Sequence, residues 1–319
     1  MLPPASIAWT PGDGGYMTRP SWFFRVLPFM EGANAYEAAE TDGSSFAMTG
    51  LHGANRNWEL LSALRQPALV CPSSSMPEVV PVATNAATQA LGAPESVPMQ
   101  AAHYVGIGGS AYRPEYDAGS GFYATAWPTR SRARDSYSGY GFNTENGLLD
   151  GACGPAENSL GYTTAGLRAC RIADVTDGMS NTFLVGEQSD YVWSADLTTG
   201  VGVDASGTPR APKLDGRSTI TDGVWADGEG GSAGEITGVT SIGHAINPTQ
   251  EEIEGHPMFR IQYVDRPWQR HTPITSAHAG GALFVRGDGS VVFVSEMVDL
   301  GVLFAMGNRA DGSLKHLSD

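Results

Sequence analysis

The chain of 319 residues lacks long apolar segments, because no run of about 18 apolar residues occurs in it. Its first residues, MLPPASIAW, have neither the charged start nor the apolar core of a secretion signal. As written, the sequence predicts a soluble chain. Basic residues are also scarce, since 19 Lys and Arg stand against 34 Asp and Glu, a formal net charge of −15. So acidic a surface repels a phosphate backbone, and we expect no nucleic-acid partner.

Cysteine is rare, with three in the chain. Cys153 and Cys170 bracket a segment whose Gly, Pro and Asn indicate a loop, and a disulfide that closed it would stabilise the fold by about 3 kcal/mol. We predict this Cys153–Cys170 disulfide for an oxidising compartment. Cys71 is then the odd cysteine, which in an exported protein indicates a partner elsewhere.

The composition favours strands and turns over long helices. The chain has 41 Gly and 20 Pro, while 41% of its residues are hydrophobic, enough for a sizeable core. We expect one domain over residues 1–319, with loop insertions at about 72–100, 110–165 and 196–258. Short helices are predicted before Pro28 and at 31–39, 57–64 and 298–306, and strands at 68–72, 101–112 and 182–187.

The stretch TSAHAGGALFVRGDGSVVFVSE, residues 275–296, predicts a hairpin. Its turn contains Asp288-Gly289, a strong hairpin signal between two apolar strands. His278 precedes the first strand, so an extended chain places it about 30 Å from Asp288. The two residues are therefore not expected to share an ion. We interpret His278 as a strand-end cap and Asp288 as a turn residue.

Two patterns that could carry catalysis have the wrong context. The sequence GGSAG around Ser232 formally matches a nucleophile elbow, but no apolar strand precedes it and no helix former follows. Four histidines fall within 35 residues, yet their spacing, even with Asp265 added, matches no zinc motif. We therefore predict no enzyme; a hydrolase is a remote alternative. The four histidines are His244, His256, His271 and His278.

Two acidic loops could supply oxygen ligands to calcium. One contains Asp222, Asp227 and Glu229, and the other contains Asp177 with Ser180 and Asn181. Neither has EF-hand spacing and Asp-Gly is itself a turn signal, so solvated turns are the preferred interpretation and calcium is the alternative. No other cofactor is expected.

Aromatic residues in loops offer flat apolar faces to sugar rings. They make an extracellular ligand-binding module, for a polysaccharide or an envelope protein, the alternative to a purely structural role. The residues are Trp127, Tyr137, Tyr140, Trp225 and Trp268.

Five segments, in this order along the chain, resemble the DUF1559 family of pilin-like, type II secretion pseudopilin-like proteins, which is expanded in planctomycete-type bacteria. They are residues 20–38, 70–74, 103–109, 171–187 and the His278 hairpin, in which nine residues separate His278 from Asp288. The last two are the most specific. The residues that carry them as structural motifs are Asp177, Gly178, Ser180, Asn181, Glu187, His278, Asp288 and Gly289.

The resemblance implies an α+β, mainly β pilin-like head, with an antiparallel sheet, few short helices and large loop insertions. Family members begin with a prepilin leader and a hydrophobic helix, followed by a segment that resembles LPPAS here. We therefore expect a natural precursor anchored in the inner membrane by a helix that this chain lacks. The same resemblance implies that the partner of Cys71 lies in that helix.

The expected function is that of a structural subunit, the head of a pilin-like filament exposed in the cell envelope or outside the cell. Its expected partners are other pilin-like subunits, which it contacts through the missing helix. The expected contact with a membrane is through that helix alone.

Overall fold

A computed structural model of the protein describes most of the chain. The described residues are 20–41, 46, 55–110, 133–135, 142–144, 146–149, 170–203, 207–220, 223–226, 238–254, 272–310, 312 and 317.

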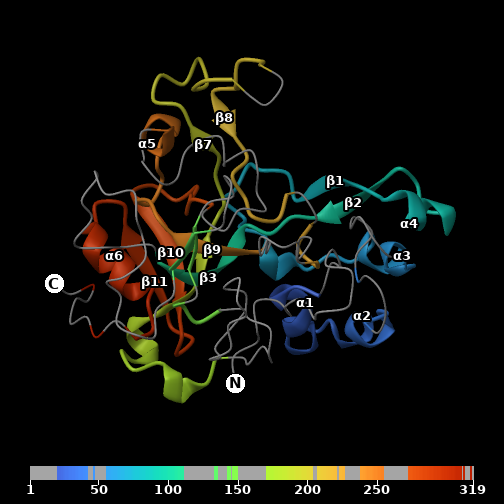
Figure 1. Ribbon diagram of the computed structural model, residues 1–319, viewed down its shortest axis with the longest axis horizontal. Coiled ribbons are helices and arrows are strands. Elements are labelled where there is room, and N and C mark those ends of the chain that lie inside the picture. The colour runs from blue at the N-terminus through green and yellow to red at the C-terminus, as the bar shows by residue number, and fades with distance from the viewer. Residues whose placement is uncertain are drawn as a thin grey trace.

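A five-stranded sheet forms the centre of the described structure (Figure 1). Neighbouring strands are antiparallel except β3 and β9, which are parallel. With its few short helices the fold is α+β and mainly β, which confirms the predicted class. In order across the sheet, the strands are β11 (Val291–Ser295), β10 (Gly281–Arg286), β6 (Phe183–Glu187), β3 (Tyr104–Ser110) and β9 (Val239–Ile242).

One face of the sheet is covered by the C-terminal helix α6 (Leu300–Met306). Asp299 caps the N-terminus of this helix, because its carboxylate accepts a hydrogen bond from the Val302 amide, a donor of the first turn that has no partner within the helix. Its apolar side chains pack with those of β3, β10 and β11. The members of this core include Val105, Ile107, Phe284, Val294 and Leu303.

The opposite face is covered near β3 and β9 by helix α1 (Trp22–Val26). Trp22 donates a hydrogen bond from Nε1 to the Gly238 carbonyl at 2.7 Å, which fixes the helix on the sheet. A side chain at Gly106 would come within 2.6 Å of Leu149 and 2.9 Å of Trp22, so only glycine lets the helix approach β3 this closely. The second core, which also holds Trp225, therefore depends on this glycine.

The remaining elements surround the sheet. The hairpin of β1 and β2, with α4 between them, projects to one side, while α5, β7 and β8 lie together at the top of Figure 1. Their bounds are η1 (Leu27–Phe29), α2 (Ala33–Ala38), α3 (Asn57–Leu61), η2 (Pro67–Leu69), β1 (Val79–Ala83), α4 (Ala86–Ala90), β2 (Ser96–Gln100), β4 (Ala133–Asp135), β5 (Phe142–Thr144), η3 (Ile172–Asp174), η4 (Met179–Asn181), β7 (Val192–Trp193), β8 (Lys213–Leu214) and α5 (Gln250–Glu254).

Two predictions for individual segments were wrong. Residues 68–72 were expected as a strand, but the 3-10 helix η2 begins at Pro67, because proline suits the first position of a helical turn. Residues 196–258 were expected as a loop insertion, but they contribute β9, a strand of the central sheet. The expected hairpin is present, with β10 paired to β11 on either side of Asp288 and Gly289.

Among the described residues, the structure contains no helix long and apolar enough to cross a membrane.

Candidate functional site

The specific sequence motifs meet at the two ends of the antiparallel pair β6 and β10. At one end, the turn of residues 177–181 packs against the hairpin turn. The Asp288 amide donates to the Met179 carbonyl at 3.2 Å, and the Gly287 amide donates to the Thr182 carbonyl at 2.8 Å. These backbone contacts make this end of the sheet a structural junction.

Residues inside this junction are held by their own hydrogen bonds. Asn181 donates from Nδ2 to the Asp177 carbonyl at 2.9 Å, and the Asp177 carboxylate accepts from the Gly312 amide at 3.1 Å. Gly178 has a φ of +94°, a conformation that favours glycine. The Asp288 carboxylate accepts from the amide and hydroxyl of Ser290, and these bonds lower its pKa.

At the other end of the pair, the last residue of β6 is a fully buried carboxylate, Glu187. Its Oε2 accepts hydrogen bonds from the Ser276 hydroxyl at 2.8 Å and the Leu283 amide at 3.0 Å. Its Oε1 accepts from the Ser189 hydroxyl at 2.7 Å. A buried carboxylate needs such donors, so the three bonds fix both its position and its orientation.

His278 and Cys71 complete a cluster with Glu187. His278 Nε2 lies 3.5 Å from Glu187 Oε1 and 3.7 Å from the Sγ atom of Cys71. The possible ligand atoms of the three residues all lie within 4.8 Å of one another. Cys71 is 2% exposed, whereas the His278 side chain is 34% exposed. We call these three residues the Cys-Glu-His cluster.

Cys71 is held in this position through His103, which is fully buried. The Cys71 amide donates to His103 Nδ1 at 3.1 Å, so a neutral His103 carries its proton on Nε2. Burial, helped by the nearby Arg217 cation, lowers the pKa of His103. Burial also raises the pKa of Tyr104, and its neighbours Cys71 and Glu187 raise it further.

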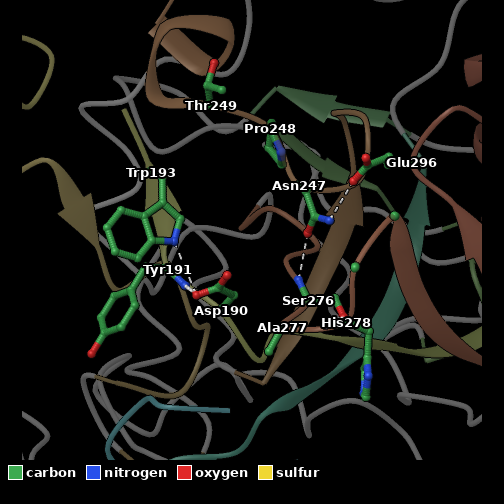
Figure 2. A pocket seen from close by; sticks show the side chains of 12 residues that line it. Asp190, Tyr191, Trp193, Asn247, Pro248, Thr249, Ser276, Ala277, His278 and Glu296 are labelled. Atoms are coloured by element: carbon green, nitrogen blue, oxygen red, sulfur yellow. Dashed lines mark hydrogen bonds between the residues drawn. The ribbon is translucent and has the colours of Figure 1, made fainter. Parts of the chain in front are cut away.

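A cleft of about 310 Å³ lies next to the cluster, and the loop of residues 276–280, which includes His278, lines part of it. Figure 2 shows Tyr191 and Trp193 along one wall and Asn247 and Glu296 along the other. The His278 ring points away from these two walls in the same view. The cleft and the cluster are therefore neighbours that share this loop, and His278 belongs to both.

The aromatic wall of the cleft is braced from two sides. Asp190 Oδ1 accepts hydrogen bonds from the Tyr191 amide and from Trp193 Nε1. The Lys213 ammonium lies 4.3 Å from the centre of the Tyr191 ring and 5.7 Å from that of Trp193. Such cation–π contacts favour this arrangement of the two rings.

Several predicted site residues lie outside the described residues. Of the acidic calcium candidates, only Asp177 is described, and its carboxylate accepts a hydrogen bond from the Gly312 amide as given above. Cys153 is not described, so the Cys153–Cys170 disulfide stays a prediction. The others outside the described residues are Asp222, Asp227, Glu229, Ser232, His256, Asp265, His271, Trp127, Tyr137, Tyr140 and Trp268.

The aromatic wall was not predicted from the sequence, and the role predicted for one tryptophan was wrong. Trp225 was proposed as a sugar-binding face, but it is fully buried in the core beside α1. Cys71 was not expected near His278 or Glu187. The signal that links the three is that each lies in a motif of the family resemblance, in residues 70–74, 171–187 and the His278 hairpin.

The fold defines the class of this protein as an α+β protein built on a mixed five-stranded sheet. Within that class, the chain belongs to the DUF1559 family (SBP_bac_10), described as proteins of unknown function, whose model matches residues 1–301. Comparisons with curated proteins and with solved structures give no match.

Proposed function

We propose that the chain is the head of a pilin-like filament subunit, exposed outside the inner membrane, and that it performs no catalysis. Family membership and the mainly β fold support this function. The observation that carries it is an exposed apolar row on β11, the strand at one edge of the described sheet.

This row consists of side chains that point away from the α6 core. Along β11 alternate side chains face opposite sides, so Val292 and Val294 pack in that core while Val291 and Phe293 face outward. Val291 is 65% exposed and Phe293 is 48% exposed, and Met297, just beyond the strand, is 86% exposed. We call Val291, Phe293 and Met297 the β11 edge row.

An apolar row at a sheet edge is a liability in an isolated protein, because the free backbone groups of the strand invite pairing with another chain. Proteins that remain monomeric usually place charges there. A subunit of a repeating assembly instead covers such a row with the next copy of itself. A second copy of this chain is therefore the occupant that we propose for the β11 edge row.

N-terminal processing of the natural gene product tests the proposal. We expect a membrane-anchored precursor and a shorter mature form, which mass spectrometry of the N-terminal peptide distinguishes. In a strain without the prepilin peptidase, only the precursor should be found. A protein with the same N-terminus in both strains, found free of the membrane fraction, would contradict the proposal.

The cleft favours a second role, compatible with the first, in binding a polysaccharide or an envelope protein. Tyr191 and Trp193 offer aromatic faces, and Asp190, Asn247 and Glu296 supply polar groups beside them. A glycan array with the purified chain tests the sugar version. A Trp193→Ala variant should lose any signal, and no signal from the unaltered chain would reject it.

A further inference from the structure

We propose that the Cys-Glu-His cluster is a binding site for a zinc-type divalent transition metal, with Cys71 Sγ, Glu187 Oε1 and His278 Nε2 as ligands. The three residues come from separate parts of the chain, since Cys71 and His278 are 207 positions apart. The fold brings the cluster together where Cys71 reaches the end of β6 and the start of β10.

Two of the three distances between the ligand atoms fit a tetrahedral ion. With zinc bonds of about 2.3 Å to sulfur and 2.0–2.1 Å to nitrogen and oxygen, tetrahedral geometry separates S and N by about 3.6 Å, and N and O by about 3.3 Å. The corresponding distances here are 3.7 Å and 3.5 Å. The third distance, between Cys71 Sγ and Glu187 Oε1, is at most 4.8 Å, against about 3.6 Å around a tetrahedral zinc ion, so an ion would have to draw these two atoms together.

Convergence on one ring nitrogen distinguishes this arrangement from a catalytic dyad or triad. In a nucleophile–His–acid triad, the nucleophile and the acid contact opposite nitrogens of the imidazole, so that the ring relays a proton. Here Cys71 Sγ and Glu187 Oε1 both lie beside Nε2 of His278. Three donors around one point are the geometry of a metal ligand set.

The surrounding residues hold these ligands in place. Glu187 Oε1 accepts one hydrogen bond, from Ser189, and so retains a lone pair for a metal. Ser276 supports two ligands, because its hydroxyl donates to Glu187 and accepts from the His278 amide at 3.1 Å. Outer contacts of this kind orient ligands and raise metal affinity.

The type of donor selects the class of ion. A thiolate together with an imidazole suits zinc and its first-row neighbours, whereas calcium and magnesium prefer oxygen ligands. Three protein ligands leave one position of a tetrahedral ion free, and the partly exposed side of His278 gives solvent a route to it. A water molecule is the expected fourth ligand.

Cobalt substitution of the chelator-treated, purified chain tests the proposal, because Co²⁺ replaces zinc and reports its ligands by colour. We expect one equivalent of Co²⁺ to give a thiolate-to-cobalt charge-transfer band and intense visible bands of tetrahedral coordination. Added Zn²⁺ should bleach both. Cobalt that binds to the wild-type chain without giving a thiolate band would overturn the proposal.

Variants identify the ligands. Cys71→Ser should lose the charge-transfer band, and His278→Gln should weaken cobalt binding at least tenfold. Glu296→Gln is the matched control, because this exposed carboxylate lies near His278 without belonging to the cluster, and it should bind like the wild type. A charge-transfer band that persists in Cys71→Ser would overturn the assignment.

A metal-bound thiolate and a disulfide exclude each other at Cys71. The family resemblance implies a disulfide partner in a preceding helix, whereas the proposed site needs the reduced thiol. Mass spectrometry of non-reduced peptides from the natural protein decides between them. A free or metal-protected Cys71 supports the metal site, and a Cys71 disulfide in the bulk of the protein would overturn it.

Discussion

Glu187 is the residue on which most contacts at the His278 end of the sheet converge. Its carboxylate satisfies two hydroxyls and one backbone amide inside the protein, and it lies 3.5 Å from the imidazole of His278. Each of those donors lost its water when the chain folded. The carboxylate therefore stabilises the fold mainly because, without it, several buried groups would have no partner.

Replacement of Glu187 by Gln tests this role. The Gln side chain has the size of Glu, but an NH2 group replaces one of the two carboxylate oxygens. This new donor then faces another donor, either the Ser189 hydroxyl or the Ser276 hydroxyl and the Leu283 amide. We expect the free energy of unfolding to fall by about 1–3 kcal/mol. Urea unfolding with a chelator present measures it without a contribution from bound metal.

The matched control is again Glu296→Gln, which alters an exposed carboxylate and should change the free energy of unfolding by less than about 0.5 kcal/mol. Equal effects of the two substitutions would contradict the role of Glu187.

At the scale of elements, the hairpin of β10 and β11 depends on a turn that only a few residues can adopt. Gly289 has a φ of +85°, and a side chain added there would meet no atom within 4 Å. A substitution at Gly289 therefore destabilises the fold through backbone strain and not through a steric clash. We expect Gly289→Ala to lower the free energy of unfolding by about 1–2 kcal/mol.

Asparagine tolerates positive φ better than alanine, so Gly289→Asn should lose less stability than Gly289→Ala. Thermal unfolding of the two variants provides the comparison. An alanine variant as stable as the wild type would show that strain at this turn does not contribute.

The same turn should make the hairpin sensitive to acid. The Ser290 hydrogen bonds lower the pKa of Asp288 below its ordinary value of 3.8. The carboxylate therefore contributes stability that is present above pH 3.8 and is lost as the pH falls through its lowered pKa. Asp288→Asn keeps an oxygen acceptor for Ser290 but does not titrate.

The stability of the wild type relative to Asp288→Asn should thus decrease as the pH falls from neutral to below 3.8. Thermal melts of both proteins across this range measure the difference. A difference in stability between the two proteins that stays constant with pH would contradict the contribution of the Asp288 carboxylate.

The elements that the sequence predicted well have local signals. Asp288-Gly289 specifies a tight turn and the flanking apolar residues specify its strands, so the hairpin was predictable. Residues 68–72 have an apolar character that also suits a strand, but Pro67 starts a helical turn instead. Strand β9, with the sequence VTSI, is short and pairs in parallel with a distant strand, which leaves no local signal.

At the scale of the whole molecule, the candidate sites depend on contacts that no local pattern encodes. Glu187 and His278 lie in recognisable motifs, but their meeting with Cys71 depends on the order of strands in the sheet. The same holds for the burial of Trp225, which reflects how α1 covers the sheet. Side-chain chemistry could be predicted from the sequence, and its assembly into a cluster could not.

The β11 edge row should matter more for assembly than for folding. Val291→Thr combined with Phe293→Thr keeps strand-forming residues but removes exposed apolar surface. We expect the free energy of unfolding of the isolated chain to fall by no more than about 1–1.5 kcal/mol, because Phe293 is 48% exposed and only its buried part contributes to the fold. In the natural protein, the same pair should reduce the amount recovered in the sheared surface fraction several-fold.

Phe29→Thr is the control for this pair, because Phe29 is 87% exposed but lies at the end of η1, away from β11. It should leave assembly unchanged. Assembly of the double variant at the wild-type level would rule out the β11 edge row as a contact between copies.

Immunogold electron microscopy of native cells tests most directly whether the protein is a filament subunit. An antibody raised against this chain, with a deletion strain as the control, is applied to whole cells and to material sheared from their surface. The account predicts label at regular intervals along surface fibres, and neither fibres nor label in the deletion strain. Label confined to the cell interior, or unlabelled fibres that persist in the deletion strain, would contradict it.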